Sequence, residues 1–166
     1  MKKIILDFSK QIKDFEIVED TKILGIYENG ALVPEKDNKL FEKFNFNINV
    51  LKPNINLKII IKSVLNSNKP FIFHPKVIIN KNTKNVSAEM SILILNEGDL
   101  TNIDVTPSLE ISENELFVNH KLVIMNFEED KLNYIRSRGL SLEESKNVLK
   151  TSFLKDIIDE INNDHE

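Results

Sequence analysis

The chain has 166 residues, of which 41% are hydrophobic and 29% are charged, and its formal net charge is −4. This length suits one domain that buries roughly two thirds of its unfolded surface. No apolar run approaches the roughly 20 residues that a membrane-spanning helix needs, and lysine is interspersed with acidic residues instead of forming the basic patch of a nucleic-acid-binding protein. Because the chain has no cysteine, disulfides, thiolate nucleophiles and cysteine-ligated clusters are excluded.

The first residues resemble a signal peptide only briefly. Met1, Lys2 and Lys3 precede three apolar residues, which Asp7 and Lys10 then interrupt. A secretory signal needs a longer apolar stretch. We therefore expect a cytoplasmic protein without membrane attachment.

The first part of the chain is patterned as strands. Asn29-Gly30 stands between apolar runs within residues 21–33 and predicts a hairpin turn, because both turn positions tolerate a positive φ. Residues 44–50 alternate strictly, with apolar side chains on one face and asparagine on the other. Residues 55–61 continue this period, and Lys58 and Lys62 fall on the polar face.

Further short apolar runs follow, with polar turns between them. They lie at 71–73, 76–79, 90–95, 103–105, 109–111, 116–118 and 121–127. His74 falls between the first two runs, and we interpret it as a turn residue. Short strands at near-regular spacing are typical of a sandwich, a barrel or a β-solenoid, and composition does not choose among them. We attribute the many asparagines to base composition in the source genome, not to an asparagine ladder.

The last third changes to a helical pattern. Acidic residues at 128–130 suit the start of a short helix, Arg136 and Arg138 suit its end, and Gly139 suits the left-handed position next to the C-cap. The sequence therefore predicts a short helix that ends before Gly139.

A second helix is predicted over about residues 142–162. Ser141 and Glu144 fit a capping box at its start. Its apolar stripe is wider than packing on a short helix needs, so part of the stripe is expected to meet another chain.

Three segments of this last third carry a family resemblance. They read TPSLEI at residues 106–111, ELFVNH at 115–120 and YIRSRGLS at 134–141. In order and spacing they resemble the C-terminal half of the SufB/SufD family, the scaffold subunits of the SUF iron–sulfur cluster assembly machine. Members of that family carry a Pro-x-Leu-Glu-Ile strand, a Ser-His pair and a Tyr-Leu-x-Ser-Arg-Gly joint that opens the last helix.

The resemblance implies a mainly β fold, with a truncated right-handed parallel β-helix over residues 1–127 and a C-terminal helical hairpin over 128–166. It also implies a non-enzymatic scaffold subunit that docks the SufC-like ATPase through its C-terminal helices. A second partner is implied at the β-helix edge, a SufB/SufD-like scaffold chain that is either a copy of this one or a longer relative. The implied partner interface comprises Tyr134, Arg136, Arg138, Gly139, Leu149, Phe153, Leu154, Ile157 and Ile158.

The chain departs from the family at its histidine. SufD-like members have Cys-Ser-His-Gly-Ala-Thr, whereas residues 118–123 here read VNHKLV. The resemblance makes His120 a metal ligand at the subunit interface, and the alternative is a partly buried histidine at a strand end. Without cysteine the chain is expected to hold no cofactor of its own, so iron or an iron–sulfur cluster would be shared with a cysteine-bearing partner.

Two other functions remain as alternatives. One is a β-solenoid interaction or structural module unrelated to cluster assembly. The other is a carbohydrate-active enzyme that uses surface carboxylates such as Asp104. Phosphate-loop, dinucleotide-binding, serine-hydrolase and zinc-protease motifs do not occur in the sequence, so ATP hydrolysis is assigned to a partner.

Overall fold

Ten strands and two helices make up the described part of the chain, a computed structural model that covers residues 1–29, 42–65, 70–97, 103–112 and 116–163. The strands are β1 (Lys2–Leu6), β2 (Phe15–Ile17), β3 (Thr21–Asn29), β4 (Glu42–Val50), β5 (Asn56–Leu65), β6 (Phe71–Ile79), β7 (Val86–Asn96), β8 (Ile103–Val105), β9 (Ser108–Ile111) and β10 (Leu116–Asn126). The helices are α1 (Glu129–Arg136) and α2 (Leu142–Asn162).

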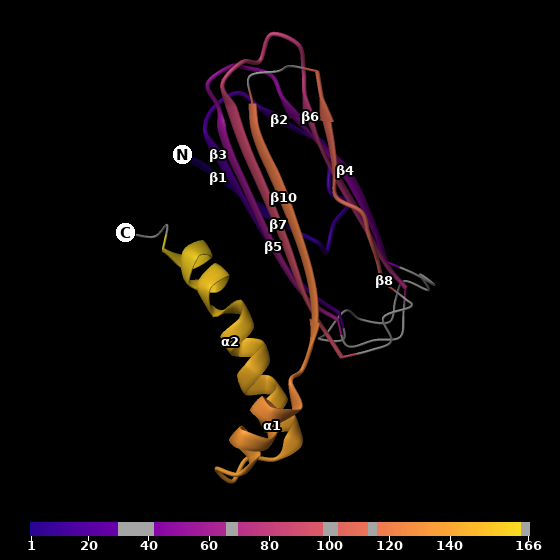
Figure 1. Cartoon of the computed structure of the whole chain (residues 1–166), viewed down its shortest axis with the longest axis vertical. Helices are drawn as coiled ribbons and strands as arrows, with labels where there is room; N and C mark the ends of the chain where they lie inside the picture. The colour runs from indigo at the N-terminus through magenta and orange to yellow at the C-terminus, as the bar shows by residue number, and fades with distance from the viewer. Residues whose placement is uncertain (30–41, 66–69, 98–102, 113–115, 164–166) are drawn as a thin grey trace.

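The strands form two sheets in which every described pairing is parallel (Figure 1). Sheet A has the order β1-β3-β5-β7-β10, and sheet B has the order β2-β4-β6-β8, with β9 also pairing with β6. Consecutive strands up to β8 therefore alternate between the sheets. Each sheet has two edge strands, so the described strands do not form a closed barrel, which was one of the three folds that the sequence allowed.

Side chains that point between the sheets form the main core. Ile48 of β4, Ile59 and Ile61 of β5, and Ile79 of β6 are each 0% exposed. The strict alternation in residues 44–50 and 55–61 predicted this inward face correctly, because side chains on a strand alternate between its two faces.

The hairpin predicted at Asn29-Gly30 is only partly within the described residues. β3 ends at Asn29, whereas residues 30–41 lie outside them. The described pairings of β3, with β1 and β5, are parallel. The next described strand, β4, belongs to the other sheet.

The interpretation of His74 as a turn residue is wrong. β6 runs without interruption through His74 and Pro75, and His74 is paired in register with Asn45 of β4. The interruption lies on the neighbouring strand instead, because β8 ends at Val105 and β9 begins at Ser108, opposite this part of β6. Proline lacks the N–H that a central strand donates, and a break in the neighbouring ladder accommodates that loss.

Four asparagines form pairs near the ends of strands, as in the asparagine ladder that the sequence analysis set aside. Asn54 and Asn85 both have positive φ, at 58° and 55°, a conformation that asparagine adopts more readily than most residues. They lie before β5 and β7, and Asn85 Nδ2 donates to Asn54 Oδ1 at 3.1 Å. A second asparagine pair lies at the ends of β7 and β10, where Asn96 Nδ2 donates to Asn126 Oδ1 at 3.5 Å.

Both helices form where the sequence predicts them, but the position of Gly139 differs from the prediction. Both hydrogen bonds of the capping box are present, from Glu144 N to Ser141 Oγ at 3.2 Å and from Ser141 N to Glu144 Oε2 at 2.8 Å. Gly139 has a φ of 98°. It stands two residues beyond the C-cap Ser137 of α1, not next to the C-cap as predicted.

Candidate interaction site at the open end and the C-terminal helices

The final strand β10 exposes side chains that face inward on every earlier strand of sheet A. Leu122 and Ile124 are in register with Ile92 and Ile94 of β7. The two β7 residues are 1% and 0% exposed, whereas Leu122 and Ile124 are 36% and 39% exposed. The difference arises because β10 is the edge strand of sheet A, so among the described residues no further strand flanks Leu122 and Ile124 on that side.

We call this surface the open end. It consists of the inward-facing side chains of β9 and β10, namely Leu109, Ile111, Leu116, Val118, His120, Leu122 and Ile124. Leu109, Leu116 and Val118 still pack partly against the core, whereas Ile111 is 46% exposed. An exposed apolar surface beside an unpaired strand edge is typical of an interaction site.

His120 lies in the middle of this surface. It is in register with the buried Met90 of β7, and it is exposed. The alternative of a partly buried histidine at a strand end is therefore wrong. Within the described residues, no group of three histidine, aspartate or glutamate side chains could hold a metal ion.

We call residues 134–141, from the last turn of α1 to the N-cap of α2, the joint. Four of the predicted interface residues are exposed there. Tyr134 is 62% exposed, and Arg136, Arg138 and Gly139 are exposed as well. Arg138 Nη2 donates to the Tyr134 hydroxyl at 2.9 Å, and its guanidinium carbon lies 5.1 Å from the centroid of the Tyr134 ring. This contact holds an aromatic ring and a cation together on the surface, a combination common in binding interfaces.

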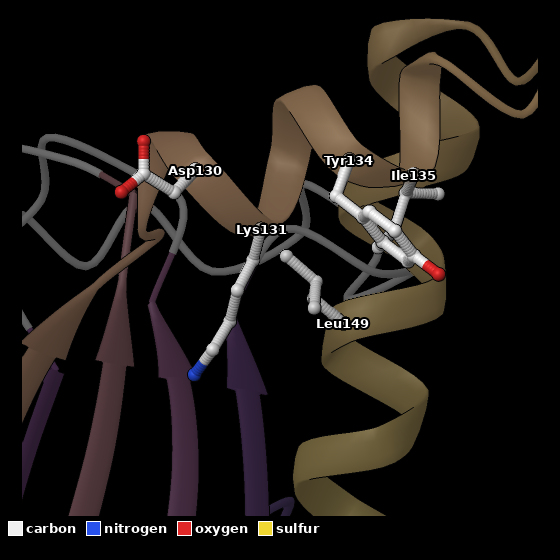
Figure 2. A pocket seen from close by; sticks show the side chains of 5 residues that line it. All are labelled: Asp130, Lys131, Tyr134, Ile135 and Leu149. Atoms are coloured by element: carbon white, nitrogen blue, oxygen red, sulfur yellow. The ribbon is translucent and has the colours of Figure 1, made fainter.

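A shallow pocket of about 290 Å³ lies beside this joint. Its lining comprises Asp130, Lys131, Tyr134, Ile135 and Leu149. In Figure 2, the Leu149 side chain extends from α2 toward α1, where Lys131 and Tyr134 flank it. The pocket therefore combines apolar walls with one side chain of each charge.

The apolar stripe of α2 is divided between the chain's own core and the surface. Leu154 and Ile157 are 3% and 2% exposed, and Leu154 belongs to a small cluster with Val64 and Leu95 of sheet A. Phe153 is partly buried against that cluster, and Ile158 is 36% exposed. A partner can therefore touch Ile158 directly, but it reaches Leu154 and Ile157 only if α2 leaves the sheet.

Sequence reasoning missed Lys62, which the strand pattern placed on a solvated face. Its side chain is only 10% exposed, and Nζ lies 2.5 Å from Asp156 Oδ1 and 2.5 Å from the Phe153 carbonyl oxygen of α2. Desolvation acts to raise the pKa of Asp156, but the hydrogen bond and charge of Lys62 outweigh it and lower this pKa. No local signal in the sequence shows that a helix covers this face.

Asp104 does not suit the acid role required of a carbohydrate-active enzyme. Its Oδ2 lies 3.0 Å from His74 Nε2, and Thr106 Oγ1 donates to its Oδ1 at 3.2 Å. His74 Nε2 has no well-aligned hydrogen-bond partner among the described residues, so the two atoms are in close contact without good hydrogen-bond geometry. The pKa of Asp104 is lowered, chiefly by His74, whereas a general acid in this chemistry needs a raised pKa.

Replacing Gly139 by alanine should destabilise the joint through its backbone. Gly139 has a φ of 98°, and no atom lies within 4 Å of the position that an added Cβ would take, so the cost is conformational and amounts to roughly 1 kcal/mol. The loss of unfolding free energy is measured by urea denaturation, monitored by circular dichroism. Gly139→Asn is the matched control and should cost less, because asparagine tolerates positive φ; equal losses for both variants would contradict this account.

Of the described helices, neither combines the length and apolarity needed to cross a membrane. The sequence matches the family SUF system FeS cluster assembly, SufBD core domain, over residues 29–153. That match begins at the end of β3 and extends into α2, so it includes the open end and the helical joint.

Two curated relatives support the same relationship. The chain is 28% identical to the iron-sulfur cluster assembly SufBD family protein ycf24 of Galdieria sulphuraria over 107 residues, which are 63% of this chain and 47% of that protein. It is 26% identical to the chloroplastic protein ABCI7 of Arabidopsis thaliana over 100 residues, which are 60% of this chain and 21% of that protein. The aligned region thus spans about half or less of each relative. Because the family match takes in most of its residues, the chain belongs to the SufBD core family of the SUF iron–sulfur cluster assembly system.

Proposed function

We propose that this chain is a non-enzymatic, SufD-like scaffold subunit in SUF-type iron–sulfur cluster assembly. The observation that carries the proposal is the family match over residues 29–153, which includes strands of both sheets and most of the helical region. On this proposal residues 1–127 form a short right-handed parallel β-helix, and residues 128–166 form a helical docking segment. The alternation of parallel strands between two sheets supports the β-helix. The cytoplasmic location stays a prediction, and the name of one relative places that protein in the chloroplast.

The helical joint is the surface proposed to dock a SufC-like ATPase. Exposed Tyr134, the arginines at 136 and 138 and the pocket over Leu149 supply aromatic, cationic and apolar contacts in one place. Interfaces draw most of their binding energy from a few such anchors. Nucleotide cycling in the ATPase would move the docked helices and change the pairing of the two scaffold chains.

The open end is the surface proposed to pair with a second scaffold chain, either another copy or a longer SufB/SufD-like relative. Its apolar side chains and free strand edge support such pairing. His120 would then face the partner. Because this chain has no cysteine, the partner would supply the thiolates, and iron or the nascent cluster would be cargo shared between the two chains.

Docking of the ATPase is tested by pull-down of the SUF ATPase with the intact chain and, as a positive control, with a longer SufB/SufD scaffold. We expect Tyr134→Ala to weaken binding at least tenfold, since loss of an aromatic anchor commonly costs about 2 kcal/mol or more. Val148→Ala is the matched control. Like Tyr134, Val148 is exposed (46%), but it lies on α2 outside the joint. Binding by the longer scaffold but not by the intact chain would contradict the proposed docking, as would equal losses for the two variants.

A further inference from the structure

Helix α2 contacts the outer face of sheet A through a series of charged pairs. Near its first turns, Lys146 Nζ and Lys150 Nζ lie 3.2 Å and 2.5 Å from the two carboxylate oxygens of Glu97, which follows β7. The Glu97 side chain is only 11% exposed. At this end the helix supplies the cations and the sheet side supplies the anion.

Farther along α2 the signs are reversed. Lys62 of β5 donates to Asp156 and to the Phe153 carbonyl, and its Nζ lies 4.9 Å from the centroid of the Phe153 ring. Near the end of the helix, Lys22 of β3 pairs with Glu160. Lys3 Nζ of β1 donates to the Glu160 carbonyl oxygen at 2.7 Å. Here the sheet supplies the cations and the helix supplies the acceptors.

This order of charges specifies one placement of the helix. A helix docked in the opposite direction would bring Lys146 and Lys150 toward the lysines of β1, β3 and β5 and leave Glu97 unpaired. Like charges at such distances are repulsive, and a nearly buried carboxylate without a cation is costly. The charges therefore set both the direction and the register of α2.

Apolar contact contributes less to this attachment than the length of the helix suggests. Of its 21 residues, only Ser145, Leu154 and Ile157 are buried. The outward side of β3, a strand that α2 contacts, also carries the fully buried Leu24. Charged groups regain hydration when an interface opens, whereas apolar groups do not, so a charge-rich interface opens at a lower free-energy cost.

We infer that α2 is a reversible strap, which docks on the outer face of sheet A through this ordered set of charges and separates from it while both sheets remain folded. Separation uncovers Leu154 and Ile157 together with the sheet side chains beneath them. Of the predicted interface residues of α2, Ile158 is accessible to a partner while the helix is docked, whereas Leu154 and Ile157 become accessible only after it separates. The inference concerns the isolated chain and does not depend on the identity of its partner.

Hydrogen–deuterium exchange measured by mass spectrometry on the full chain tests this. We expect the amides of α2 to exchange faster than those of β5 and β7, and to become faster still when salt is raised from about 0.05 to 1 M, since salt screens the partly exposed pairs. Exchange of α2 and β5 at one common rate, unaffected by salt, would overturn the inference.

Charge reversal supplies the second arm of the test. Lys22→Glu should accelerate exchange in α2 about tenfold without changing β7, and the double variant Lys22→Glu/Glu160→Lys should restore the wild-type rate. Lys155→Glu is the matched control, with the same change of charge at an exposed position of α2, and should leave the rate unchanged. No rescue by the double variant, or an equal effect of the control, would show that apolar packing alone holds α2. Because the ATPase is absent from this experiment, its failure leaves the proposed docking untouched.

Discussion

Replacing Phe73 by alanine should lower the free energy of unfolding by about 3–5 kcal/mol, the range for removing a large aromatic side chain from a packed core. Phe73 is 1% exposed and lies on β6, the strand of sheet B that pairs with β4, β8 and β9. Its ring centroid is 6.0 Å from that of Phe8, 5.9 Å from that of Phe46 and 6.0 Å from that of Phe71. Truncation therefore leaves a cavity between aromatic rings of β4, of β6 and of the segment that follows β1. A domain of this kind has a total stability of roughly 5–15 kcal/mol, so the variant loses a large share of it.

Urea denaturation followed by far-ultraviolet circular dichroism measures this loss. Phe117→Ala is the matched control, because Phe117 is 61% exposed on the outward side of β10, and its replacement should change stability by less than about 0.5 kcal/mol. If the two variants shift the unfolding midpoint equally, the main core does not lie between sheets A and B.

The sequence predicts correctly what depends on neighbouring residues. Alternation places Phe46 and Val50 on the buried face, at 2% and 0% exposed. The capping box of Ser141 and Glu144 sets the start of α2 at Leu142. These features succeed because strand alternation and helix capping both act within a few residues of the chain.

Strand pairing lies beyond such local reasoning. An alternating segment looks the same whether its partner is parallel or antiparallel, and in this chain β5 pairs with β3 and β7, not with its sequence neighbours β4 and β6. The Asn-Gly signal after β3 predicts a local hairpin, yet the described partners of β3 come from other parts of the chain. The turn predicted at His74-Pro75 fails for a related reason, since a proline within a strand depends on what the neighbouring strands do at that level.

The sequence indicates where in the chain the candidate site lies, but not which of its side chains are exposed. The segment at 134–141 points to the joint, and the joint is exposed. The same reasoning does not separate Ile158, which is exposed, from Leu154 and Ile157, which are buried, because that division depends on how the helix packs on a sheet that is distant in the sequence. The burial of Lys62 has the same origin.

The open end shows a further limit of local pattern. Leu122 and Ile124 have the same alternation as buried residues on β7, and that alternation does not show which strand lies at the edge of sheet A. Their exposure follows from the strand order alone. This is also why His120 reaches the surface, although it occupies a register position that is buried on β7.

Replacing Ile124 by aspartate should abolish pairing through the open end while leaving the fold intact. Ile124 is already 39% exposed in the isolated chain, so the charge remains hydrated there and costs little stability. In a paired complex the same carboxylate would be enclosed by apolar side chains without a cation, which costs several kcal/mol. We therefore expect pairing to weaken at least about 100-fold, the equivalent of roughly 2.8 kcal/mol.

Sedimentation velocity over a range of concentrations measures this pairing, first with the chain alone and then with a longer SufB/SufD scaffold. Ile5→Asp is the matched control, since Ile5 is an exposed isoleucine (52%) on β1, at the opposite edge of sheet A. Equal weakening by both substitutions would indicate a general effect of charge instead of an interface at the open end. The proposed pairing would be contradicted if the wild-type chain stayed monomeric at high concentration and did not bind the longer scaffold. The exposed Leu122 and Ile124 would then pair with neither of the two proposed partners.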